Sequence, residues 1–125
     1  MKKKVKVKEE VENILYWHFM WSWSELEKEV YENAKRHGWW DQKRNDGELI
    51  ALMHSELSEA LEALRKDPKE KDGKCPEFTN LEVEFADVII RIMDYARARK
   101  LRLSEAILAK MAYNKTRPYK HGKKF

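Results

Sequence analysis

The segment from Leu81 to about Lys100 carries apolar residues around most of its circumference when it is drawn as a helix with 100° per residue. The gap that remains is a narrow polar stripe of Glu84, Asp87, Arg91 and Asp94. A helix this apolar should be buried on two sides. We therefore expect its acids to point into protein or into a lined cleft.

The rest of the chain also favours helices, because its four glycines and three prolines stand mainly between apolar, helix-periodic stretches. We expect an all-α fold of four helices, at residues 24–37, 46–66, 81–100 and 104–114. The expected N-terminal caps are Ser24 (with Glu27 at capping-box spacing), Asn45 or Asp46, Asn80 and Ser104. Gly38 suits a left-handed C-cap, and residues 67–79 form a polar loop.

Residues 1–23 are predicted as an N-terminal extension of uncertain structure, and residues 24–125 as a helical domain with a basic C-terminal tail. Val5 and Val7 alternate with lysines as in a strand, whereas residues 9–23 equally fit a helix. The aromatic residues of this extension suit either a packing or dimer-contact segment or a surface that stacks on nucleobases.

Charge is distributed unevenly along the 125 residues, whose net charge is +4. Residues 1–8 and 115–125 each carry five basic residues and no acid, which leaves 16 bases against 22 acids in residues 9–114. An acidic body argues against nucleic acid as the partner. Cys75 is the only cysteine, and neither a signal peptide nor a membrane-spanning stretch is recognisable. The sequence thus predicts a cytoplasmic protein without a membrane partner.

Two acid pairs are unusual in their position. Glu56 falls inside the apolar arc of the helix expected at 46–66, and Glu59 falls at its edge. If this helix and the next form an antiparallel hairpin, the pair faces Glu84 and Asp87. Buried carboxylates must be paired, neutralised or metal-bound. Four oxygen ligands without a histidine or cysteine set suit Mg²⁺ or Mn²⁺, and a salt-bridged core with Arg91 is the alternative.

Basic and polar residues gather around the end of the last expected helix: Lys110, Asn114, Lys115 and Arg117. Each can complement a helix C-terminus, and together they suit phosphate recognition. Trp39 and Trp40 precede the acidic helix, where they either stack on a base or cover an edge of the core.

These motifs resemble a known family. Glu56-x-x-Glu59, a 24-residue spacer and Glu84-x-x-Asp87 look like the metal motif of the MazG-like, all-α nucleoside triphosphate pyrophosphohydrolases. Two further stretches resemble the loop before that motif and the C-terminal phosphate-side segment: His37-Gly38-Trp39-Trp40-Asp41 and Asn114-Lys115-Thr116-Arg117-Pro118. The resemblance covers roughly residues 24–122.

The resemblance implies a MazG-like four-helix bundle, assembled as a homodimer or homotetramer, in which Glu56, Glu59, Glu84 and Asp87 bind Mg²⁺. It also implies cleavage of a nucleoside triphosphate into a monophosphate and pyrophosphate, as in cleaning of the nucleotide pool. Substrate-binding roles then fall to Trp39, Trp40, Lys110, Asn114, Lys115 and Arg117. Arg91 departs from relatives that have an aromatic residue there. The competing hypothesis is a catalytically silent helical module that binds a partner protein or nucleic acid.

Overall fold

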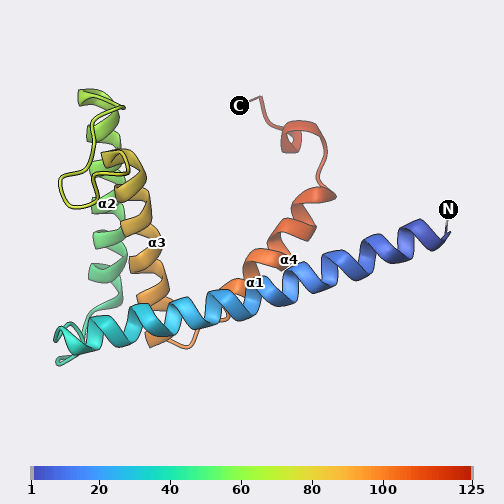
Figure 1. Cartoon of the computed structure of the whole chain (residues 1–125), viewed down its shortest axis with the longest axis horizontal. Coiled ribbons are helices and arrows are strands. Elements are labelled where there is room, and N and C mark those ends of the chain that lie inside the picture. Colours follow the sequence, from blue (N-terminus) through green and yellow to red (C-terminus); the bar gives the residue numbers. More distant parts are fainter. Residues whose placement is uncertain (1, 125) are drawn as a thin grey trace. The chain divides into compact units, whose positions relative to one another are not determined.

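The computed structural model describes the backbone of residues 2–124 and the side chains of residues 12–124. The described chain is all-α (Figure 1), apart from an isolated bridge between Lys71 and Thr79. Its helices are α1 (Lys2–Arg36), α2 (Asp46–Lys66), α3 (Asn80–Ala98), α4 (Leu103–Lys115) and the short 3₁₀ helix η1 (Tyr119–Gly122). The predicted fold class is confirmed at this level.

The start expected for the first helix at Ser24 was wrong. Helix α1 is continuous over 35 residues, so Ser24 lies well inside it, and residues 5–7 are helical rather than extended. No glycine or proline occurs before Gly38 to interrupt it. The spacing of Ser24 and Glu27 is therefore not a helix start here. Helix α1 ends as expected near Gly38, whose φ of +82° is the left-handed conformation of a C-cap.

The chain divides into two compact units, Met1–Leu26 with Leu101–Phe125 and Glu27–Lys100. The second unit is built on a hairpin in which α2 and α3 run antiparallel, side by side (Figure 1). Of the two expected caps, Asn45 rather than Asp46 caps α2, because the Asn45 side chain accepts a hydrogen bond from the Glu48 amide at 3.1 Å. Among the described residues, no helix has the length and apolar character needed to cross a membrane.

Helix α3 is capped by Thr79 rather than by the expected Asn80. The Thr79 hydroxyl accepts from the Glu82 amide at 3.2 Å, and the Glu82 carboxylate accepts from the Thr79 amide at 2.8 Å. This reciprocal capping box defines the start of α3. In the preceding polar loop, Asp67 and Asp72 accept hydrogen bonds from amides two or three residues further on, which holds the turns in place.

The N-cap of helix α4 lies two residues before the expected Ser104, at Arg102, and no side chain caps the helix. Ser104 therefore does not cap it.

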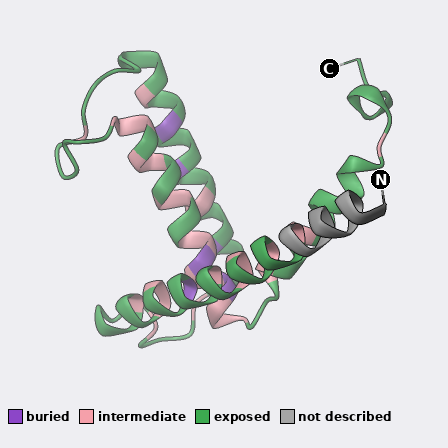
Figure 2. Ribbon diagram, turned by 45° about the vertical axis from the view of Figure 1, so that its right-hand side comes forward, coloured by how far each residue is buried: buried purple, intermediate pink, exposed green. Residues whose placement is uncertain are grey.

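Few residues are fully buried, as Figure 2 shows. Leu49 and Ala60 of α2, with Met93 and Ala96 of α3, form the buried apolar core. The expectation that α3 is buried on two sides was wrong for a single chain, because a two-helix hairpin covers only one of them. Three large residues on α3 stay about half exposed: Phe85, Ile89 and Ile90.

Candidate metal centre

Three of the four predicted acids meet on the hairpin. One carboxylate oxygen each from Glu56 of α2, and from Glu84 and Asp87 of α3, lie within 4.8 Å of one another. The antiparallel packing of the helices produces this contact, because Glu56 faces α3 and is only 8% exposed. Glu59 follows one turn later on α2, is exposed, and lies outside this group of three.

The three clustered acids repel one another. Burial raises the pKa of Glu84 from 4.5 to about 7, and the charges of Glu59, Asp87 and Glu56 add to the rise. Burial also raises the pKa of Asp87, together with the charge of Glu56. Glu59 acts on Glu84 both through its charge and through a side-chain hydrogen bond that favours the protonated form of Glu84, although Glu59 lies outside the group of three. Such a site favours any positive charge that enters it.

Arg91 supplies part of that charge. Its Nε donates to Oε1 of Glu56 at 2.5 Å, an ion pair in which the Glu56 side chain is 10% exposed and the Arg91 side chain 39%. The salt-bridged alternative is thus present at Glu56. It does not extend to Glu84, whose Oε2 is buried and has no hydrogen-bond partner among the described residues.

The donor set fits a hard divalent cation. The cluster offers carboxylate oxygens only, and Mg²⁺ and Mn²⁺ prefer such ligands over sulfur or imidazole nitrogen. The buried oxygen of Glu84 without a partner has the chemistry of a ligand atom. Among the described residues, Arg91 alone forms an ion pair with one of the three clustered acids, and the charge of Lys74 also acts on Asp87.

The two tryptophans of the loop after α1 differ in their surroundings. Trp40 is half-buried, and its indole nitrogen donates to Oδ1 of Asp94 at 2.8 Å. Its ring also lies 5.3 Å from the guanidinium of Arg44 and 5.6 Å from that of Arg99. Trp39 is 62% exposed, and the guanidinium of Arg44 lies 5.6 Å from its ring. The sequence left two alternatives for these residues, stacking on a base or covering an edge of the core. Trp40 covers an edge of the core, whereas the ring of Trp39 remains accessible.

The sequence analysis did not identify Arg44 and Arg99, the two arginines that lie over the ring of Trp40. Arg99 binds Asp46 through Nε at 2.7 Å and donates to the carbonyl oxygen of Arg44 at 3.1 Å. These contacts span more than fifty residues of chain, which no local pattern reveals. One feature of the sequence could have indicated these contacts: Asp94 continues the polar stripe of α3 toward the C-terminal end of the helix, where Arg99 lies.

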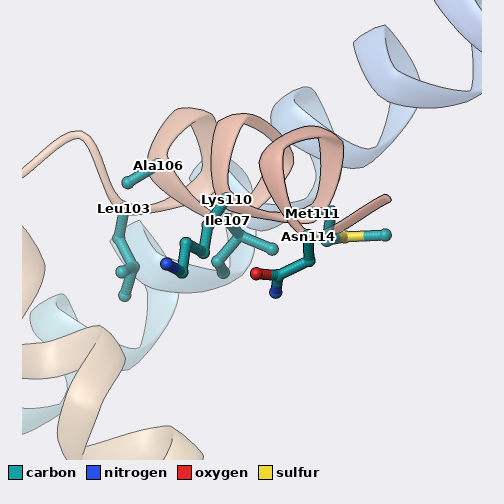
Figure 3. A pocket seen from close by; sticks show the side chains of 6 residues that line it. All are labelled: Leu103, Ala106, Ile107, Lys110, Met111 and Asn114. Atoms are coloured by element: carbon teal, nitrogen blue, oxygen red, sulfur yellow. The ribbon is translucent and has the colours of Figure 1, made fainter. Parts of the chain in front are cut away.

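The expected phosphate-binding residues lie around α4, in the other unit. Lys110 and Asn114 line one face of α4 beside four apolar side chains (Figure 3): Leu103, Ala106, Ile107 and Met111. Lys115 donates to the hydroxyl of Tyr16 at 3.4 Å, and the guanidinium of Arg117 lies 5.9 Å from the ring of Tyr113. Their part in binding phosphate stays a prediction.

Fold and site together define an all-α protein with a carboxylate cluster on a helical hairpin. Comparisons with family models, with curated proteins and with solved structures found no match for the chain. The resemblance to MazG-like enzymes therefore stays a prediction made from the sequence motifs.

Proposed function

We propose that this chain is a magnesium-dependent nucleoside triphosphate pyrophosphohydrolase that releases a nucleoside monophosphate and pyrophosphate. The observation that carries the proposal is the meeting of one carboxylate oxygen each from Glu56, Glu84 and Asp87 within 4.8 Å, with a buried oxygen of Glu84 that has no hydrogen-bond partner among the described residues. The order and spacing of the two acid pairs, which resemble the MazG-like motif, connect this geometry to phosphate-bond hydrolysis.

Glu56, Glu84 and Asp87 would hold Mg²⁺, or Mn²⁺ in its place, with Glu59 beside them. A divalent cation bound there would neutralise phosphate charge and acidify a coordinated water. Glu59 is exposed next to Glu84 and is suited to accept a proton from an attacking water.

The substrate would be oriented by residues outside the cluster. The accessible ring of Trp39 suits stacking on a base, whereas the indole nitrogen of Trp40 is already bonded to Asp94. Side chains around the end of α4 would hold phosphate or sugar oxygens: Lys110, Asn114, Lys115 and Arg117. All except Arg117 are exposed, and Lys115 already donates a hydrogen bond to the hydroxyl of Tyr16.

The proposal includes a homodimer or homotetramer in the cytoplasm, where the enzyme would remove unwanted nucleotides. The exposed apolar residues on the outer side of the hairpin support assembly. These include Leu57, Leu61 and Leu64 of α2 and Phe85, Ile89 and Ile90 of α3.

The test is release of pyrophosphate from a panel of normal, deoxy and damaged nucleoside triphosphates in the presence of Mg²⁺. Glu84→Gln and Asp87→Asn should each lower the rate at least about 100-fold, because each removes a proposed ligand charge while keeping the side-chain size. Glu62→Gln is the matched control, since Glu62 is an exposed acid on α2 whose ion pair with Lys66 is 3.9 Å long.

Failure to release pyrophosphate from any of these substrates would contradict the proposal, as would full activity in both ligand variants. Binding of a protein or of DNA without turnover would instead favour the silent interaction module.

A further inference from the structure

Arg91 stands at the junction between the acidic cluster and the rest of the polar stripe of α3. It follows Asp87 by one helical turn and precedes Asp94 by nearly one turn. Its charge opposes the rise that burial causes in the pKa of both acids. Among the described residues, no other basic side chain makes an ion pair with a member of the cluster.

The contact with Glu56 uses only part of the guanidinium. Nε carries the hydrogen bond to Oε1 of Glu56, and the described residues provide no hydrogen bond for the two terminal amino groups. The Arg91 side chain is also 39% exposed, about four times the fraction of its partner. Two amino groups in the plane of the guanidinium are therefore available beside the acidic cluster, and this geometry suits the oxygens of a phosphate.

A cation and Arg91 compete for the same carboxylate. Any divalent ion bound by Glu56, Glu84 and Asp87 adds positive charge within a few ångströms of the guanidinium, which weakens the ion pair with Glu56. The repulsion disappears when a polyphosphate arrives with the ion, because the phosphate oxygens then offer Arg91 a new anionic partner.

We propose that Arg91 has two successive partners: it neutralises Glu56 in the cation-free site and binds the phosphate chain once cation and triphosphate are both present. The inference rests on the proposed function and extends it to a residue of the phosphate subsite. It predicts opposite effects of Arg91 on two binding steps. Arg91 opposes binding of the cation alone and favours binding of the cation with a triphosphate.

The test measures binding rather than turnover, on the full chain. Titration with Mn²⁺ alone, followed by electron paramagnetic resonance, should show about tenfold tighter binding in Arg91→Met than in the unmodified chain. Calorimetric titration with inorganic tripolyphosphate in saturating Mg²⁺ should show binding about ten- to a hundredfold weaker in the same variant. Arg91→Lys should keep the opposition to Mn²⁺ but recover tripolyphosphate binding only in part, because lysine lacks the planar fork.

Arg97→Met is the matched control, because it removes one arginine from the same helix at a position without an ion pair among the described residues. It should leave both affinities within about twofold of the unmodified chain. Circular dichroism of each variant verifies the helical content. If Arg91→Met does not fold, the comparison of Arg91→Lys and Arg91→Gln carries the test.

A parallel fall in both affinities would show that Arg91 only supports the fold, and would overturn the inference. Unchanged tripolyphosphate binding, or an unmodified chain that binds no Mn²⁺, would overturn it as well. Failure of the proposed function looks different: the chain would bind Mn²⁺ and tripolyphosphate with the predicted signs and still release no pyrophosphate from a nucleotide.

Discussion

The indole nitrogen of Trp40 and Oδ1 of Asp94 form a 2.8 Å hydrogen bond that joins the loop after α1 to the last turns of α3. Asp94 lies on the same polar stripe as the clustered acids Glu84 and Asp87. The bond therefore ties the tryptophan loop to the helix that carries the candidate site, although 54 residues separate the two side chains.

Loss of this bond should weaken the fold. Trp40→Phe keeps an aromatic ring but leaves the half-buried Asp94 carboxylate without its donor, which should lower the free energy of unfolding by about 1–3 kcal/mol. Trp39→Phe is the control, because Trp39 is 62% exposed, and it should change stability by less than about 0.5 kcal/mol. Urea denaturation measures both. Equal effects of the two substitutions would contradict the structural role of the Trp40 bond.

Stability should depend on pH through Glu84. Its pKa is raised to about 7 in the folded chain, so between about pH 4.5 and 7 the folded state holds a proton that the unfolded state has lost. The free energy of unfolding should therefore increase as the pH falls from about 7 to 4.5. Above about pH 7, Glu84 is ionised in the folded chain, and the destabilisation caused by its buried charge is complete. The raised pKa values of Asp87 and Asp94 act in the same direction.

With a chelator present, the urea midpoint should thus be higher near pH 5.5 than near pH 7.5. Glu84→Gln, which cannot ionise, should reduce this difference. Addition of Mg²⁺ should stabilise the unmodified chain most at about pH 7.5, because the cation replaces the proton. A pH profile that is the same with and without the substitution would exclude Glu84 as the source.

The capping box at the start of α3 offers a direct comparison. Thr79→Ala removes the hydroxyl that accepts from the Glu82 amide and should cost about 1 kcal/mol. Ser104→Ala should cost much less, because the side chain of Ser104 makes no cap at the start of α4. Thermal or urea unfolding distinguishes the two. A larger loss at Ser104 than at Thr79 would restore the capping role that the sequence had suggested for Ser104.

Gly38 ends α1 with a φ of +82°, where a β-carbon would also lie 3.1 Å from Oδ2 of Asp41. Gly38→Ala should therefore lower stability by about 1–2 kcal/mol, since L residues resist the left-handed region. Gly73→Ala is the matched control: the added methyl meets no atom within 4 Å, so the change should be neutral or slightly stabilising. A neutral Gly38→Ala would show that the α1 end adapts freely.

Assembly should depend on the outer apolar side of the hairpin. Ile89 is 48% exposed, and Ile89→Glu should shift sedimentation velocity profiles toward the monomer if this side forms the contact between copies. Lys69→Gln makes the same change in net charge at an exposed loop position and should leave the profile unchanged. A monomeric unmodified chain would remove the proposed homodimer and homotetramer.

Local patterns were sufficient for much of the helical hairpin. The apolar periodicity, the polar loop and the cap at Asn45 placed α2 and α3 within about two residues of their observed ends. They failed at α1, because the spacing of Ser24 and Glu27 also occurs inside uninterrupted helices. The cap of α3 was misplaced by one residue, because Thr79 and Asn80 are both good caps and only the bond to Glu82 distinguishes them.

Which acids lie on apolar helix faces follows from residue order alone, since a helix repeats every 3.6 residues. With the added assumption of an antiparallel hairpin, that pattern led us to expect all four acids, Glu56, Glu59, Glu84 and Asp87, to meet, and three of them do. Packing in three dimensions decided the rest: Glu59 remained outside the group, Arg91 paired with Glu56, and Trp40 bonded to Asp94 while Trp39 stayed exposed. The physical reason is that two side chains interact only where the packing of helices and loops brings them close together. The periodicity of residues within one helix gives no information about its distance from another element.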